Sequence, residues 1–122
     1  MERERLERYF QVYSTDYEKA VADYYTDDIV FEYAGRRYSG KAEVLDYFRS
    51  IRVNFQETLR PVDIILEADR AAAEVDAELV AVRDLPEFWG RPFRQGEAVR
   101  MTFGIFYRFR EGRISRVRIY RP

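Results

Sequence analysis

Three stretches in the first half of the chain carry apolar residues at the spacing of an α-helix. Apolar side chains recur in this way at Leu6, Tyr9, Phe10 and Tyr13, again at Tyr17, Ala20, Val21 and Tyr24, and again at Val44, Leu45, Phe48 and Ile51. Ser14, Thr15 and Asp16 break the first stripe and offer a cap for the second helix, and Ser39 offers a cap for the third. The pattern therefore predicts three helices.

Most of the remaining sequence alternates between apolar and polar positions, which is the period of a β-strand. A short strand is expected at 29–34, followed by a turn at 35–37 and a return strand at Tyr38. Longer strands are expected at 56–67, 70–83, 98–110 and 113–121, with a loop at 84–96. Pro61 interrupts the first of these, which places that strand near a sheet edge or at a bulge.

Helices followed by meandering strands indicate an α+β fold, in which helices cover one face of an antiparallel sheet. The sequence shows no internal repeat, linker or low-complexity segment. Its 122 residues are close to the commonest domain size, so we expect a single domain over residues 1–122.

Aromatic residues are abundant, with ten Tyr and nine Phe. They predict a core of large rings or a cavity that such rings line. The chain has no Cys, which excludes disulfides and thiolate chemistry, and no His, which removes the usual general base and the commonest metal ligand. A metal site would have to rely on carboxylates and carbonyls. We expect neither a metal nor a cofactor.

The N-terminal segment MERERLERYF is charged and lacks the apolar core of a signal peptide. No apolar stretch approaches the roughly 20 residues that a membrane span needs. These features predict a cytoplasmic protein that makes no membrane contact.

Charge is distributed unevenly behind a formal net charge of −1. Residues 91–122 hold nine Arg against two Glu, a net +7, so the rest of the chain carries −8. Such asymmetry can indicate an anionic partner, or two halves that pair with each other. The arginines are interleaved with rings, as on a single-strand nucleic-acid platform, but the rings fall mainly on the opposite strand face. Glu74, Asp76 and Glu78 could pair with these arginines if strand 70–83 lies beside strand 98–110. We therefore expect no nucleic-acid partner.

Asp27 and Asp28 adjoin an apolar strand, and the pair admits two interpretations. Paired acids can perform general acid–base chemistry. They can also mark the junction between a helix and a strand, because short polar side chains bond nearby backbone groups there.

The chain carries three stretches in a particular order, RYFQVYSTDYEKAVADYYTDD (8–28), YAGRRYSGKAEVLDYF (33–48) and FREGRISRVRIYR (109–121). Together they resemble the nuclear transport factor 2-like superfamily, and within it the SnoaL-like polyketide cyclases, ketosteroid isomerases and limonene epoxide hydrolases. The resemblance implies a cone-shaped fold, with three N-terminal helices packed on a strongly curved, mostly antiparallel sheet around an apolar ligand pocket. It also implies that Asp27 and Asp28 form a helix–strand junction.

The catalytic residues of these families, carried over position by position, are mostly absent. Tyr9 matches the oxyanion-binding Tyr of ketosteroid isomerases, but their base and second acid fall on Tyr33 and Ile105. The final-strand Asp of limonene epoxide hydrolases falls on Ile119. Asp76 can be matched to the Asp that these enzymes carry on an earlier strand, but the alternation places Asp76 on the polar face of its strand. Scytalone-dehydratase-like chemistry needs His. No catalytic residue is therefore assigned.

The resemblance and the strand parity together predict which side chains line the pocket. We expect them to be Tyr9, Tyr13, Phe31, Tyr33, Trp89, Phe103, Ile105 and Ile119. Trp89 belongs to the loop segment FWGRPF, which can form a lid, contact a second subunit or close the wide end of the cone. The competing interpretation is that most of the tyrosines are core residues whose hydroxyls are satisfied locally.

Two functions are open at this point. The first is a small-molecule pocket protein that acts as a cofactor-free isomerase, cyclase or hydrolase on an apolar terpenoid, steroid-like or polyketide-like compound, with Glu32 and Asp63 as fallback acids. The second is a non-catalytic ligand-binding or dimerisation module. A buried carboxylate with a raised pKa inside the cone would favour the first. The charged strand faces, together with the dimers common in the resembled family, predict a homodimer through the outer sheet face.

Overall fold

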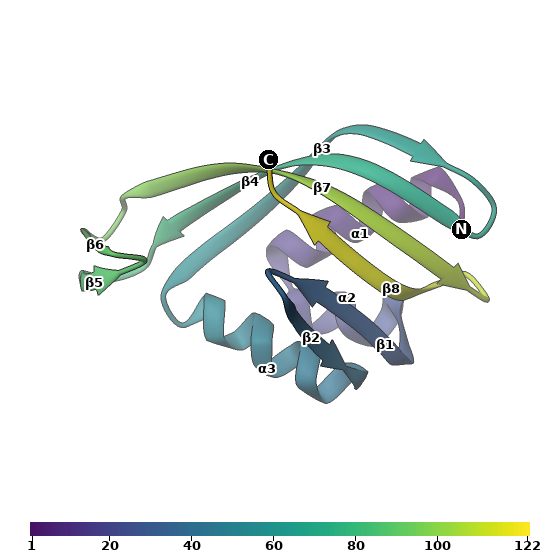
Figure 1. Ribbon diagram of the computed structural model, residues 1–122, viewed down its shortest axis with the longest axis horizontal. Coiled ribbons are helices and arrows are strands. Elements are labelled where there is room, and N and C mark those ends of the chain that lie inside the picture. The colour runs from purple at the N-terminus through teal and green to yellow at the C-terminus, as the bar shows by residue number, and fades with distance from the viewer.

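The computed structural model describes residues 1–122 as three helices and a curved sheet (Figure 1). The helices are α1 (Arg3–Thr15), α2 (Tyr17–Tyr24) and α3 (Gly40–Arg52). The strands are β1 (Tyr25–Tyr33), β2 (Arg36–Ser39), β3 (Phe55–Leu66), β4 (Arg70–Ala81), β5 (Leu85–Phe88), β6 (Arg91–Phe93), β7 (Ala98–Arg110) and β8 (Arg113–Tyr120). No helix combines the length and the apolar character that a bilayer crossing requires.

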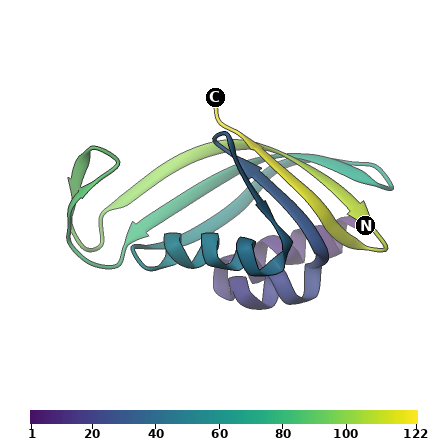
Figure 2. The same cartoon turned by 60° about the horizontal axis from the view of Figure 1, so that its bottom comes forward.

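Six strands form one sheet in the order β2-β1-β8-β7-β4-β3, and β5 pairs with β6 in a separate hairpin. All neighbours in the large sheet are antiparallel except β1 and β8. The sheet arches over the helices, which all lie on its concave side (Figures 1 and 2). This arrangement confirms the predicted α+β fold, and the four long strands begin and end within two residues of their predicted bounds.

Alternation along β4 and β7 builds the interface between the sheet and the helices. The buried residues of these two strands fall on odd positions only, and they are Ala71, Ala73, Val75, Ala77, Leu79, Ala81, Phe103, Ile105, Tyr107 and Phe109. Alanines on the inner face of β4 leave room for large rings from the facing elements. Tyr9 and Phe10 of α1 use this space and pack edge-on against Tyr107, with centroids 6.3 and 6.1 Å away.

Strand β3 lies at the edge of the sheet, and its register shifts between Pro61 and Asp63. Proline has no backbone N–H to donate, so it is tolerated at an edge or a bulge. The interpretation of Pro61 drawn from the sequence is therefore confirmed.

Two local expectations need correction. Strand β1 begins at Tyr25, directly after α2, so Asp27 and Asp28 lie inside the strand and not at a helix end. Both are exposed, and they form ion pairs with Lys41 at 3.4 Å and Arg110 at 2.5 Å respectively, which is a structural role. Residues 84–96, predicted to be a loop, contain the β5–β6 hairpin.

Candidate functional site

A cavity of about 50 Å³ lies between the helices and the concave face of the sheet, and we refer to it as the cone cavity. Buried side chains form one part of its lining, which we call its deep end, and half-buried ones from β1, α3, β3 and β8 form the other, which we call its mouth. Seven of the eight predicted pocket residues line it, namely Tyr9, Tyr13, Phe31, Tyr33, Phe103, Ile105 and Ile119. The structure thus brings these seven together.

Trp89, the eighth, lies outside the cone cavity. It stands at the tip of the β5–β6 hairpin with a φ of 53°, beside Gly90 with a φ of 78°. Its ring stacks on Phe55 with centroids 5.3 Å apart, and Phe88 and Phe93 complete a separate aromatic cluster. This hairpin lies at the end of the sheet that is farthest from α1 and α2 (Figure 1). Trp89 therefore covers Phe55 and not the cavity.

The positions that hold acids in the resembled enzymes meet in the structure, but none of them is acidic here. Tyr33 of β1 is paired with Ile119 of β8, and Ile119 is paired with Ile105 of β7. All three line the cone cavity. The wall that these strands contribute is therefore free of carboxylates.

The cone cavity does contain one acid, Glu57, which the sequence did not single out. Glu57 follows the buried Phe55 on the inner side of β3 and is only 7% exposed. Its Oε1 accepts a hydrogen bond of 2.5 Å from the hydroxyl of Tyr13. Nη2 of Arg52 lies 3.9 Å from the same oxygen, so both side-chain contacts of the carboxylate are made by Oε1. One carboxylate oxygen is thus held and the other is free.

Burial has the largest influence on the ionisation of Glu57. Loss of hydration disfavours the carboxylate and raises the pKa of Glu57, while the Tyr13 hydrogen bond and the charge of Arg52 act in the opposite direction. Arg52 is packed over the rings of Tyr13 and Tyr17, with its guanidinium carbon 5.1 and 4.9 Å from their centroids. It also donates to the backbone oxygen of Tyr13 at 3.0 Å. These contacts hold a positive charge near Glu57 without a close ion pair.

Two tyrosines share a hydrogen bond at the deep end of the cone cavity. The hydroxyls of Tyr9 and Tyr25 lie 2.6 Å apart. Burial raises the pKa of both residues, so both remain protonated at neutral pH. Only Tyr9 lines the cavity, whereas Tyr25 is fully enclosed. When Tyr25 donates the shared bond, the proton of Tyr9 is free for a ligand oxygen.

The two fallback acids lie elsewhere. Glu32 alternates with the cavity residues of β1, and its Oε1 accepts hydrogen bonds from Arg116 at 2.7 Å and Arg118 at 3.4 Å. Arg116 contributes most to holding the pKa of Glu32 below its ordinary value. Asp63 is exposed beside the bulge in β3. Neither carboxyl lines the cone cavity.

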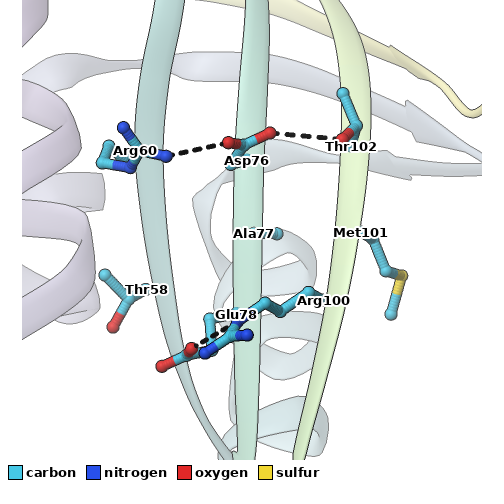
Figure 3. A pocket seen from close by; sticks show the side chains of 8 residues that line it. All are labelled: Thr58, Arg60, Asp76, Ala77, Glu78, Arg100, Met101 and Thr102. Carbon is cyan, nitrogen blue, oxygen red and sulfur yellow. Dashed lines mark hydrogen bonds and ion pairs between the residues drawn. The ribbon is translucent and has the colours of Figure 1, made fainter.

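A larger hollow, of about 510 Å³, lies against β3, β4 and β7, where charged side chains of the outer face surround it (Figure 3). Asp76 accepts hydrogen bonds from Arg60 at 2.9 Å and from Thr102 at 3.2 Å. Arg100 bonds Glu78 at 3.0 Å. These cross-strand pairs are the ones expected if the acidic and basic strands are neighbours. The charged groups satisfy one another, so this hollow offers no free acid or base.

The cone cavity has a defined chemical capacity. Its carboxylate can accept a proton at Oε2, and the phenols around it can donate hydrogen bonds to an oxygen that gains negative charge. No three acidic side chains gather where they could hold a metal ion. The signal that could have revealed Glu57 is its position two residues after Phe55, on the same face of β3.

Comparison with known proteins places this geometry in context. Residues 6–117 match the sequence model of the SnoaL-like domain. No curated protein matches the chain in sequence.

Several solved structures share the fold. A proposed polyketide cyclase from Xanthomonas campestris pv. campestris is 21% identical, with a TM-score of 0.81 over 97% of this chain and 87% of the other. A proposed polyketide cyclase from Pseudomonas putida KT2440 is 23% identical, with a TM-score of 0.79 over 97% and 89%. An LEH-like epoxide hydrolase from M. tuberculosis is 16% identical, with a TM-score of 0.75 over 98% and 80%. These similarities confirm the expected fold.

Proposed function

Because the chain belongs to the SnoaL-like domain family, we propose that it binds a small apolar carbonyl compound in the cone cavity and moves a proton on that compound without a cofactor. The observation that carries the proposal is Glu57, a buried carboxylate with a raised pKa in a cavity that is otherwise apolar or phenolic. Such groups are suited to general base catalysis, since a base works best when its pKa approaches the working pH.

Each side chain at the deep end has a separate role in this proposal. Glu57 takes a proton from a carbon next to the carbonyl through its free Oε2. Tyr13 holds Oε1 and so fixes the direction of Oε2. Tyr9 donates a hydrogen bond to the carbonyl oxygen, which gains negative charge as the proton leaves. Isomerisation and aldol-type cyclisation both begin with this step.

The volume of the cavity limits which part of a ligand it can enclose. About 50 Å³ is far below the roughly 300–1,000 Å³ of most small-molecule sites. We propose that the closed cavity takes the carbonyl end of the ligand, and that the remainder lies between Tyr33 and Tyr47 at the mouth. A terpenoid, steroid-like or polyketide-like body requires these rings to turn outward, together with Tyr38, which stacks on Tyr47 at 4.3 Å.

A general test is deuterium exchange on a compact ketone, because it requires no knowledge of the natural substrate. Cyclopent-2-enone is dissolved in D₂O with the protein, and loss of its acidic C–H signals is followed by proton NMR. The wild-type protein should accelerate exchange, and Glu57→Gln should reduce the acceleration about 10²–10⁴-fold. Equal exchange by the two proteins would contradict the role of Glu57.

The second candidate, a non-catalytic binding module, is favoured by one observation. The family's acid positions are occupied by Tyr33, Ile105 and Ile119, which cannot replace a carboxylate as a base at neutral pH. Under this alternative the ketone would bind, and its resonances would shift, but its C–H signals would persist.

We also propose a homodimer formed by the outer faces of two sheets. Ile65, Phe106 and Tyr120 expose 68%, 55% and 54% of their surface on this face. Clustered exposed apolar side chains of this kind mark interaction surfaces. The charges that surround them support a second copy of this chain as the partner.

A further inference from the structure

Tyr107 is buried in the wall of the cone cavity, and its hydroxyl has no hydrogen-bond partner. The residue is only 2% exposed, and it lines the cavity beside Tyr9. It occupies an inward-facing position of β7, on the same face as Phe103 and Ile105, which also line the cavity. The cavity wall therefore includes a phenol to which the protein gives no hydrogen bond.

An unpaired hydroxyl at such a site carries a cost. A polar group that is largely removed from water and gains no hydrogen bond in return lowers the stability of the folded protein. Phenylalanine would fill the same space without that cost, and the neighbouring ring contacts with Tyr9 and Phe10 need only the aromatic ring. The fold itself therefore does not require the oxygen of Tyr107. A ligand that accepts a hydrogen bond in the cavity would pair with the hydroxyl of Tyr107.

We propose that Tyr107 is a second hydrogen-bond donor to the ligand oxygen and that, together with Tyr9, it selects carbonyl compounds that can form an enolate. This inference rests on the proposed function and adds to it a specificity residue. Tyr9 comes from α1 and Tyr107 from β7, and their rings meet edge-on at 81°. Two hydrogen-bond donors on one oxygen favour a ligand whose oxygen becomes negatively charged. An alcohol or an ether, whose oxygen stays neutral, would be bound less well.

The proton balance of the step is simple. The C–H bond next to the carbonyl breaks, and the proton passes to Oε2 of Glu57. The electron pair forms a carbon–carbon double bond, and the carbonyl oxygen becomes an enolate oxygen that receives hydrogen bonds from Tyr9 and Tyr107. Glu57 then returns the proton to carbon, so neither an oxidant nor a second reactant is needed. Burial raises the pKa of Tyr107, with a further contribution from Tyr9, so the phenol stays a donor and does not lose its own proton.

The test compares Tyr107→Phe with a matched control, Tyr24→Phe. Tyr24 is also buried and its ring lies 5.6 Å from that of Tyr9, but it does not line the cone cavity. Cyclopent-2-enone labelled with ¹³C at the carbonyl reports hydrogen bonding through its chemical shift. Tyr107→Phe should reduce the shift caused by binding and slow deuterium exchange about 10²–10³-fold. It should also leave the melting temperature unchanged or raise it, whereas Tyr24→Phe should keep both the shift and the exchange rate.

The outcomes separate this inference from the proposed function. A Tyr107→Phe variant that keeps the carbonyl shift and the exchange rate would overturn the role of Tyr107, even if Glu57→Gln abolishes exchange. A wild-type protein that shifts the carbonyl resonance in a Tyr107-dependent way, but exchanges no deuterium, would retain the donor and overturn the catalytic proposal. A carbonyl resonance that the wild-type protein leaves unmoved would overturn both.

Discussion

Single residues in the cone cavity supply reactive groups and lower the stability of the folded protein. Glu57 leaves water with only one oxygen hydrogen-bonded, and its nearest positive charge is 3.9 Å away. A buried carboxylate with a raised pKa is less stable in the folded protein than in the unfolded chain. A core selected for stability alone would hold a neutral residue at this position. Glu57 therefore supports a chemical role better than a packing role.

This cost predicts how Glu57→Gln changes stability with pH. Between the ordinary pKa and the raised pKa, the folded protein binds more protons at Glu57 than the unfolded chain does. The contribution of Glu57 to the free energy of unfolding therefore falls as pH rises through that window. Glutamine has no charge to bury, so the variant should melt at a higher temperature than the wild type at pH 7, and the difference should vanish near pH 4.

Thermal melts of both proteins at several pH values between 4 and 8 measure this effect. For a domain of this size, each 1 kcal/mol gained corresponds to roughly 3–6 °C in melting temperature. A melting difference that is constant across the range would show that the pKa of Glu57 is the same in the folded protein and in the unfolded chain. A lower melting temperature for the variant at pH 7 would show that Arg52 depends on the carboxylate more strongly than a 3.9 Å separation implies.

At the scale of elements, the sequence predicted the fold well because its periods are regular. Strands β4 and β7 keep one parity from end to end, so their inner residues could be read directly. Strand β3 does not, because the shift between Pro61 and Asp63 moves the inward side from odd to even positions. A single alternation over 56–67 therefore does not exist, and Glu57 was not recognised as an inward residue.

The β5–β6 hairpin was missed for a different reason. Its two-residue turn places Trp89 at a positive φ, where Asn, Asp or Gly is usual. The stacking of Trp89 on Phe55 helps to hold this conformation. A tertiary contact, which no local pattern reports, thus stabilises the turn and draws Trp89 away from the pocket to which the sequence assigned it.

One element-level prediction concerns the start of α2. The side chain of Asp16 accepts a hydrogen bond of 3.1 Å from the backbone N–H of Lys19, which satisfies one free donor of the helix end. Asp16→Ala should lower the free energy of unfolding by about 0.5–2 kcal/mol. Asp27→Ala is the matched control, because that side chain is 98% exposed and makes one surface ion pair, which is worth about 0–1 kcal/mol. Urea unfolding of both variants provides the measurement, and a larger loss for Asp27→Ala would contradict the capping role.

At the scale of the whole molecule, the uneven charge of the sequence is largely explained within one chain. Arginines of the C-terminal strands pair with acids of the N-terminal half, as Arg110 does with Asp28 and Arg116 with Glu32. This favours the interpretation in which the two halves pair with each other. Some charges on the outer face are left over, since Arg108, Glu74 and its register partner Asp63 make neither an ion pair nor a side-chain hydrogen bond.

Arg108 and Glu74 lie on opposite sides of an apolar row. Ala72 is paired with Phe106, Arg108 lies two residues beyond Phe106 on β7, and Glu74 lies two residues beyond Ala72 in the other direction. Consider a two-fold axis that lies between two such sheets, perpendicular to the strands and along the Ala72–Phe106 row. This axis would place Arg108 of each subunit opposite the row of the partner subunit that contains Glu74. The same contact would cover the exposed rings of Phe106 and Tyr120, which meet edge-on at 5.8 Å.

This geometry predicts the response of the dimer to charge reversal. The wild-type protein should sediment at micromolar concentration as a species of roughly 29 kDa, twice the chain mass of 14.7 kDa. Arg108→Glu should weaken the dimer about tenfold or more, because it sets like charges against each other across the interface. The double variant Glu74→Arg with Arg108→Glu should restore association, since the exchanged charges are again complementary.

Glu18→Arg, on α2 and away from this face, should leave the dimer unchanged. A wild-type protein that sediments only at 14.7 kDa would remove the proposal, and a double variant as weak as the single one would show that this pair of charges does not meet.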